Sequence, residues 1–254
     1  MFALGFRVAA RERVTLALGL GYYSLFIFLF AAVWRHTPFA TQPDRSISFA
    51  TMVWYIAVTE LVTFSGMQFR EQVRFDIQAQ QLSGLMGLPL PYWQLKLMQL
   101  LGRGLLNFMI LGLGGFALAS LIAGGVPFPP AVGAAVLASG LLAMMLTLTI
   151  CLSIGLLDVW GQFARPVYWI WQKSLFVLGG LMLPLSLYPA ALREVALCTP
   201  FPAMVALPAQ LVFRQDLDGF GIIVAQQLGW LALFAALALW LHGKARRHIG
   251  AEGD

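Results

Sequence analysis

Side chains that could perform acid–base or metal chemistry are few in this sequence of 254 residues, and they lie far apart. Catalysis needs a nucleophile, a base or a metal ion within reach of one another. The three histidines, His36, His242 and His248, form no HExxH motif, and no GxSxG motif is present. The sequence also lacks GxxxxGK(S/T), the loop that binds ATP phosphates. We therefore predict no catalytic residue, no metal site and no cofactor in this chain.

Glu60 differs from the other acidic residues because it falls deep inside a long apolar run. Thr63 lies one helical turn further along if this run is a helix. A carboxyl group at such a depth in a membrane is costly and usually faces a bundle interior or an aqueous path. The sequence leaves two roles open for Glu60: a group that contacts a substrate or a proton, and a packing residue that is protonated or hydrogen-bonded. We take Glu60 and Thr63 as candidates for a transport path.

Three further polar side chains lie within apolar runs. Asn107 stands among several glycines, and small residues let helices approach closely while an amide can bridge them. Packing is favoured over substrate contact for Asn107, which we keep as a path candidate. Gln226 and Gln227 are ambiguous, because either could face a cavity.

The composition requires a membrane environment. Hydrophobic residues make up 60% of the chain and charged residues 11%, with a mean hydropathy of +0.80. Several uncharged runs reach the roughly 20 residues needed to cross a bilayer. Little sequence is left for a soluble domain, so we predict a single transmembrane domain over 1–254. The net charge of +5 comes from basic residues at the ends of the runs, which argues against nucleic acid as a partner.

The apolar runs predict an all-α integral membrane protein with six transmembrane helices, preceded by an amphipathic helix over Phe2–Arg13. The predicted spans are 14–34, 47–69, 97–123, 132–157, 169–188 and 220–241. An even number of spans places both termini on one side. Four of the 16 Lys and Arg residues fall on the opposite side, namely Arg35, Arg45, Arg193 and Arg214. Because cytoplasmic loops are rich in Lys and Arg, both termini are predicted to be cytoplasmic.

The stretch from Gln172 to Pro208 stays apolar but contains repeated prolines. Proline removes a backbone donor and stops a helix, and inside lipid the freed groups must find partners in protein or in a water-lined cavity. We expect one helix that ends near Tyr188, followed by short re-entrant or outer helices over 189–213. Broken segments of this kind often border a translocation path. An ordinary helix followed by a proline-rich outer loop fits the spacing equally well.

The most polar part of the chain is the loop 70–94 between the second and third predicted spans. From Glu71 to Leu82 it mixes apolar, charged and amide side chains at partly helical spacing. A short helix with both kinds of surface can dock into a groove of a soluble partner. Composition alone favours the alternative, a helix that only rests on the membrane surface.

Two patterns resemble those of a known family. The first lies in the inner loop and consists of Ile77, Leu82, Leu85 and Pro89. Within it, Gln80 replaces the family's glycine and Leu88 its usual basic residue. The second lies in the broken stretch and consists of Gly179-Gly180, Pro184-Leu185, Pro189, Leu192, Pro200-Phe201 and Pro208. With these patterns the chain resembles, over nearly its whole length, the membrane permease of type 2 ABC exporters (the ABC-2 family), in the viologen-exporter-like branch.

The resemblance implies partners, a location and an activity. The partners would be two P-loop ATPase subunits that carry Mg-ATP, a second permease that is identical or homologous, and membrane lipid. The location would be the bacterial cytoplasmic (inner) membrane. The activity would be ATP-driven export of a molecule, and the weakly charged interior suits a lipophilic or amphipathic one. The outward direction rests on the resemblance alone.

The resemblance also implies roles for particular residues. The inner loop would be the coupling helix that contacts the ATPase, through Arg74, Asp76, Ile77, Gln80 and Leu82. The amphipathic N-terminal stretch would be a connecting helix. The outer re-entrant helices would close the path, with Pro189, Leu192, Pro200, Phe201 and Pro208 as their defining residues. Gly179, Gly180 and Pro184 join Glu60, Thr63 and Asn107 as path candidates.

Two other classes of function compete with a transporter. An integral membrane enzyme of lipid metabolism would need a reactive cluster near an interface, and the sequence shows none. A membrane scaffold or assembly protein would use the glycine-rich third span and the inner loop to hold its partners.

Overall fold

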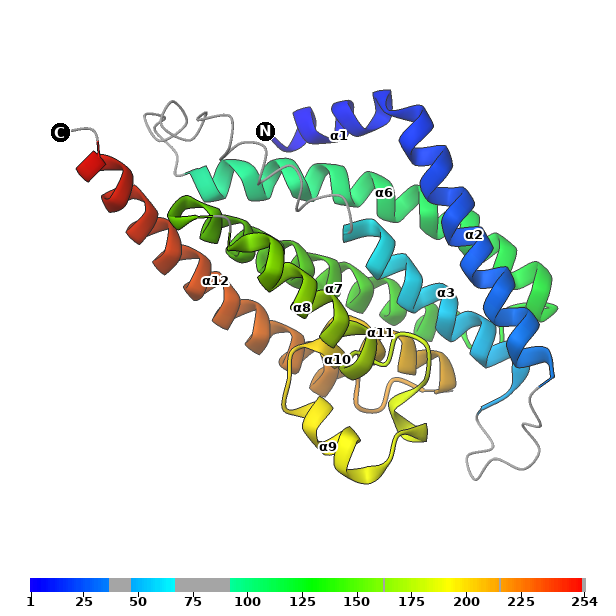
Figure 1. Cartoon of the computed structure of the whole chain (residues 1–254). Helices are drawn as coiled ribbons and strands as arrows, with labels where there is room; N and C mark the ends of the chain where they lie inside the picture. The colour runs from blue at the N-terminus through cyan, green and yellow to red at the C-terminus, as the bar shows by residue number, and fades with distance from the viewer. Residues whose placement is uncertain (37–46, 67–91, 162, 215, 253–254) are drawn as a thin grey trace.

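The structure, a computed structural model, describes residues 1–36, 47–66, 92–161, 163–214 and 216–252 (Figure 1). Within these ranges the chain forms helices and turns without strands. Five helices are long and apolar enough to cross a membrane. The chain is therefore consistent with a multi-pass membrane protein of all-α class, as the composition predicted.

The first two helices meet at a short break. α1 (Phe2–Arg11) and α2 (Arg13–Arg35) are separated by Glu12, whose backbone leaves the helical region at φ −83° and ψ 55°. The Glu12 carboxylate pairs with Arg103 of α6, which fixes this corner. α1 has an exposed basic face and an exposed apolar edge at Phe2 and Leu4. These features agree with the amphipathic N-terminal helix that was predicted.

α1 lies directly against α6 (Tyr92–Ala123), and glycines make the approach possible. A Cβ atom at Gly5 would lie 2.0 Å from the carbonyl oxygen of Gln99, and one at Gly102 would lie 2.2 Å from that of Phe2. No side chain fits at such distances, so the two helix backbones touch at this crossing. The small residues of the third predicted span therefore serve helix packing at this position.

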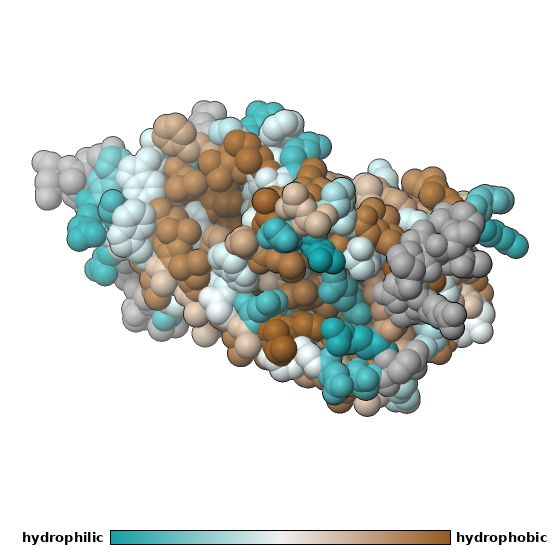
Figure 2. Space-filling model, turned by 90° about the horizontal axis from the view of Figure 1, so that it is seen from below, coloured by the Kyte–Doolittle hydropathy of each residue, from teal (hydrophilic) through white to brown (hydrophobic). Residues whose placement is uncertain are grey.

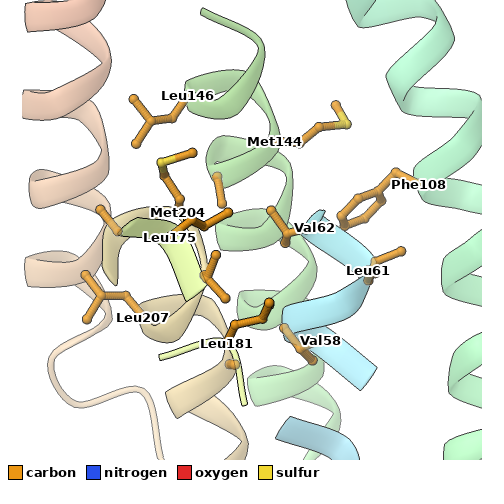
Figure 3. Close-up of a cluster of buried hydrophobic side chains, with 14 of the residues drawn as sticks. Val58, Leu61, Val62, Phe108, Met144, Leu146, Leu175, Leu181, Met204 and Leu207 are labelled. Carbon is orange, nitrogen blue, oxygen red and sulfur yellow. The ribbon is translucent and has the colours of Figure 1, made fainter. Parts of the chain in front are cut away.

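α3 (Phe49–Gly66) and α7 (Pro130–Leu156) form the centre of the bundle. In each, 78% of the residues in an apolar 18-residue stretch are buried inside the protein. The corresponding share is 17% for α2 and for α12 (Phe220–Glu252). Their side chains meet those of α6, α8 and the short helices in one apolar cluster, which includes Val62, Met144 and Leu207 (Figure 3). The outer surfaces of α2 and α12 carry exposed large apolar side chains, as expected for helices that face lipid.

The segment predicted as the fifth span is organised differently. Its helix, α8, runs over Ala164–Leu178 and ends well before Tyr188, where it was expected to end. At 15 residues it is about 22 Å long, shorter than the hydrocarbon core of about 30 Å. Gly180 ends it with φ +69°, a left-handed conformation that suits glycine at this place after a helix. α8 is accordingly not among the five long apolar helices, and the predicted count of six spans is not reached by helix length.

Short helices fill the region between α8 and α12. They are η3 (Leu185–Leu187), α9 (Ala190–Leu197), α10 (Phe201–Met204), α11 (Ala206–Gln210) and η4 (Leu211–Phe213). Over 189–213, where short helices were expected, the chain thus forms three short α-helices and the 3-10 turn η4, and η3 precedes them. Residues 202–209 are all buried, whereas most of α9 is exposed.

α12 extends further than the predicted sixth span, because the basic tail continues the same helix to Glu252. α1 and the C-terminal end of α12 lie at one end of the bundle, and α9 lies at the other (Figure 1). We call these the terminal end and the α9 end.

Candidate functional site

A small cavity lies between α3, α7, α8 and Val205, the residue that separates α10 from α11. Its volume is about 40 Å³, enough for water but not for a larger molecule. The lining residues are Val62, Thr63, Gly66, Thr147, Tyr168, Trp171, Gln172, Leu175, Phe176 and Val205. We call this space the central cavity.

Helical spacing explains how the central cavity is lined. On α8 the lining residues are Tyr168, Trp171, Gln172, Leu175 and Phe176. Their spacing of three or four residues places them on one face of the helix. On α3 the lining face ends at Gly66, where an added Cβ would come within 2.8 Å of a Thr147 methyl carbon. Gly66 therefore lets α3 and α7 approach at this edge of the cavity.

The two threonine hydroxyl groups at the central cavity have partners within their own helices. Thr63 Oγ1 donates to the carbonyl oxygen of Thr59 at 2.9 Å, and Thr147 Oγ1 to that of Ala143 at 2.9 Å. The indole of Trp171 packs beside Tyr168, with ring centroids 5.1 Å apart. Trp171 Nε1 is buried and has no hydrogen-bond partner in the described part of the chain. The cavity wall is thus largely aromatic, and one of its side chains carries a buried N–H group without a partner in the described residues.

Glu60 does not line the central cavity, although it lies one turn from Thr63. Its side chain is 2% exposed, and its Oε1 atom accepts no hydrogen bond within the described residues. Thr59 donates to the backbone at Ile56 rather than to the carboxyl group. Of the two roles left open, a packing residue held by hydrogen bonds from Thr59 or Thr63 does not fit this geometry.

A neighbouring polar contact joins α2 to α3. The hydroxyl of Tyr23, a fully buried side chain, donates to the carbonyl oxygen of Ala57 at 2.6 Å. An added Cβ at Gly115 of α6 would overlap the Tyr23 ring, so that glycine makes room for the tyrosine. This contact packs α2, α3 and α6 together on the Glu60 side of α3.

Gly179, Gly180 and Pro184 form a junction beside the cavity rather than part of its lining. The Tyr55 hydroxyl donates to the Gly180 carbonyl oxygen, and its ring stacks on Phe213 at 5.4 Å between centroids. A Cβ at Gly180 would lie 3.1 Å from both Ala206 Cβ and the Tyr55 oxygen. Pro184, which is buried, precedes the first turn of η3. The junction therefore ties the end of α8 to α3 and α11.

The ambiguous glutamines are now distinguished. Gln227 is 1% exposed, and its amide group donates to the carbonyl oxygens of Ser139 and Ala203, both at 3.0 Å. Its Oε1 accepts from Ser139 Oγ at 3.1 Å. Gln227 is thus a fully bonded bridge from α12 to α7 and α10, whereas Gln226 is exposed. Asn107 is buried on α6 and does not belong to the cavity lining.

The remaining predicted residues fall into two groups. The proposed coupling residues Arg74, Asp76, Ile77, Gln80 and Leu82 lie outside the described residues. In the outer region, Pro189 and Pro200 immediately precede α9 and α10, and Pro208 lies in α11. Leu192 and Phe201 are half-buried. Within the described ranges, no three His, Cys, Asp or Glu side chains come close enough to hold a metal ion.

Sequence reasoning missed the aromatic lining of α8. Trp171 and Phe176 fell within the predicted span 169–188 and Tyr168 just before it, and none of them was singled out as a candidate. Their spacing on one helical face was visible in the sequence, but nothing there showed that this face would meet Thr63 and Gly66 across a cavity.

A second hollow, larger than the central cavity, opens at the α9 end. It measures about 490 Å³ and is lined by Leu185, Ser186, Arg193, Leu197, Gln210, Phe213 and Arg214. We call it the arginine pocket.

Comparison of the chain with models of known protein families finds no match, and comparison with curated proteins finds none either.

Proposed function

We propose that this chain is the transmembrane subunit of an ATP-driven transporter of the ABC-2 type, and that a separate P-loop ATPase powers it. The supporting observation is the arrangement around the central cavity. The buried short helices α10 and α11 pack against the buried central helices, and an aromatic-lined space lies beside them. Broken helices beside a central site are a recurrent feature of membrane transporters.

In this proposal the small central cavity represents a closed state of the transporter. A space of about 40 Å³ cannot hold a lipophilic cargo, so transport requires the helices that line it, α3, α7 and α8, to move apart. Rigid-body movement of packed helices between two arrangements is the usual way in which such paths open. The structure then corresponds to a closed path, and ATP binding on the partner would supply the free-energy difference between closed and open states.

The cargo class follows from the cavity wall. Aromatic and aliphatic side chains dominate it, and Gln172 adds an amide group. A lipophilic or amphipathic molecule with a hydrogen-bond acceptor suits such a wall. On the basis of the resemblance in the sequence, we further propose that the chain exports its cargo from the bacterial cytoplasmic membrane. It would pair with a second permease and couple to the ATPase through Arg74–Leu82.

Glu60 belongs to this proposal as a group beside the path. A buried carboxyl group with an unbonded oxygen is costly in a membrane unless function retains it. Replacing it by glutamine keeps the shape and removes the acid. We expect Glu60→Gln to change the rate or substrate preference of transport with little effect on folding. Full transport with unchanged preference would remove Glu60 from the path.

The partner is tested by purifying the tagged chain in mild detergent after co-expression with its neighbouring genes. We expect a stoichiometric P-loop ATPase, and we expect the double substitution Asp76→Ala, Ile77→Ala to uncouple ATP hydrolysis from transport while the chain stays folded. Asp216→Ala, at the opposite end of the bundle from the termini, serves as the matched control.

Two results would contradict the proposal. A well-folded preparation without any ATPase would remove the energy source. An ATPase complex that forms normally but supports no flux would favour the scaffold alternative instead.

A further inference from the structure

Two arginines that are distant in the sequence come together in the arginine pocket. Arg193 lies on α9 and Arg214 follows η4, yet both line one hollow of about 490 Å³. Four Lys and Arg residues in the chain were predicted on the side opposite the termini, and these are two of them. Topology alone explains why few basic residues lie there, but it gives no reason for two of them to converge.

The charges in the arginine pocket are available to a ligand. Its lining contains no carboxylate, and neither arginine forms an ion pair with another residue that the structure describes. Arg214 Nη1 donates to the backbone oxygen of Asp218 at 2.7 Å, which orients the guanidinium and leaves its other N–H groups unused. Ser186 and Gln210 add polar groups to the same wall.

The rest of the arginine pocket is apolar and firmly supported. Leu185 is buried and packs on Ala196 and Ala206. Phe213 is held by its stack on Tyr55. Leu197 lies one helical turn after Arg193 on α9, so it shares a face with that arginine. A cationic wall therefore adjoins an apolar floor within one space.

Figure 2 shows the molecule from below the view of Figure 1, so that the α9 end faces the reader. Hydrophilic side chains interrupt a mostly hydrophobic face there instead of forming only a rim. Polar groups inside an apolar surface are typical of a site that orients a ligand.

We propose that the arginine pocket binds an anionic amphiphile. Arg193 and Arg214 hold its phosphate or carboxylate head, and Leu185, Leu197 and Phe213 contact the beginning of its apolar chain. Guanidinium groups bind such heads through paired, charge-assisted hydrogen bonds. The volume lies within the range of small-molecule sites, about 300–1,000 Å³. This proposal does not rest on the proposed transport function, because it concerns binding by the chain itself.

Binding is measured by calorimetry on the full chain purified in a nonionic detergent, with hexyl phosphate as the probe. We expect saturable binding, and we expect Arg193→Gln with Arg214→Gln to weaken it by at least about tenfold. Arg35→Gln, which removes an exposed arginine outside this pocket, is the matched control and should bind as the parent does. Lysine at both positions keeps the charge but loses the paired geometry, so it should recover only part of the affinity.

The apolar floor has its own test. Leu197→Ser changes an exposed side chain and should weaken hexyl phosphate while leaving inorganic phosphate unaffected. Equal affinity for the two anions in the parent chain would overturn the assignment of an amphiphile. Unchanged hexyl phosphate binding in the double glutamine variant would overturn the assignment of the site.

Two sources of the ligand are separated by a third measurement. Native mass spectrometry on chain reconstituted with phosphatidylglycerol, and separately with phosphatidylcholine, reports how many lipids remain bound. An arginine-dependent excess of phosphatidylglycerol identifies a membrane lipid. Hexyl phosphate binding without that excess identifies a soluble amphiphile. Both results support the shared chemistry, and arginine-independent retention of both lipids contradicts it.

Discussion

The central cavity and the arginine pocket differ in almost every physical respect, although both adjoin the same broken segment. The central cavity is small, uncharged and walled by aromatic side chains of α8. The arginine pocket is about twelve times larger, by the volumes of about 490 and 40 Å³, and carries two guanidinium groups. The junction at Gly180 is linked to the arginine pocket, because the Tyr55 hydroxyl donates to Gly180 and the Tyr55 ring stacks on Phe213 of the pocket.

The difference indicates where the chain can change shape. A space closed by packed aromatic rings must open before it can accept a cargo, whereas a charged, open pocket can bind without rearrangement. Phe213 lines the arginine pocket and stacks on Tyr55, which holds Gly180 next to the end of α8. The junction is therefore the element through which the two hollows would influence each other. Four substitutions test this division, and they are ordered by the size of the effect.

Gly180→Val should have the largest effect. Its φ of +69° strains a β-branched residue by about 1–2 kcal/mol, and the new side chain would overpack against Ala206 and Tyr55 by about 1–3 kcal/mol. We expect a marked loss of folded yield and of the thermal unfolding midpoint in detergent. Gly229→Val, where an added Cβ meets nothing within 4 Å, is the control. Equal shifts for the two variants would show that the junction is not tightly packed.

Gln227→Leu should come next, because it removes the bridge from α12 to α7 and α10. Three hydrogen bonds are lost, each worth about 0.6 kcal/mol within a membrane, so the stability should fall by about 1–2 kcal/mol. Urea or thermal unfolding in detergent measures the loss. Gln226→Leu, an exposed neighbour, should leave stability unchanged. The same loss in both variants would indicate a general effect of α12 rather than this bridge.

Tyr55→Phe is a milder change at the junction itself. It removes the hydroxyl that donates to Gly180 but keeps the ring that stacks on Phe213. We expect a stability loss of about 0.5–1.5 kcal/mol and faster proteolysis between α8 and α9. Unaltered proteolysis together with unaltered stability would mean that the hydroxyl does not hold the junction.

Trp171→Phe should have the smallest effect on stability, within about 0.5 kcal/mol. The substitution removes a buried N–H that has no partner in the described residues, and this offsets part of the lost indole contact. If the donor serves a cargo, transport of acceptor-bearing substrates should fall while folding is preserved. A large loss of stability would instead reveal an intramolecular partner for the N–H.

The long apolar elements were predictable from sequence because length and hydropathy decide them. α2 begins and ends within one residue of the predicted span 14–34, and α7 begins two residues before and ends one residue before the predicted span 132–157. The amphipathic N-terminal helix was also predicted, since α1 follows the pattern of Phe2–Arg13. Hydropathy did not predict where α8 ends. Residues 179–188 are as apolar as a membrane helix, but Gly180 and Pro184 stop the helix there.

The candidate site was less predictable, since it depends on how helices face one another. Of the two path candidates on α3, Thr63 lies at the central cavity and Glu60 does not line it. The role of Gly180 as a junction, and the convergence of Arg193 with Arg214, depend on contacts between segments that are distant in sequence. Gln227 shows the same limit, because its three partners lie on α7 and α10.

The proposed transport path is tested most directly by locking the central cavity shut. A Cβ at Gly66 would lie 3.7 Å from the Cβ of Thr147, within the range of about 3.5–4.5 Å for disulfides. We would therefore combine Gly66→Cys and Thr147→Cys in a chain with Cys151 and Cys198 replaced by serine, reconstituted with its ATPase. We predict that oxidation stops ATP-driven flux without dissociating the complex, and that reduction restores it. Full flux with the crosslink in place would contradict a transport path between α3 and α7.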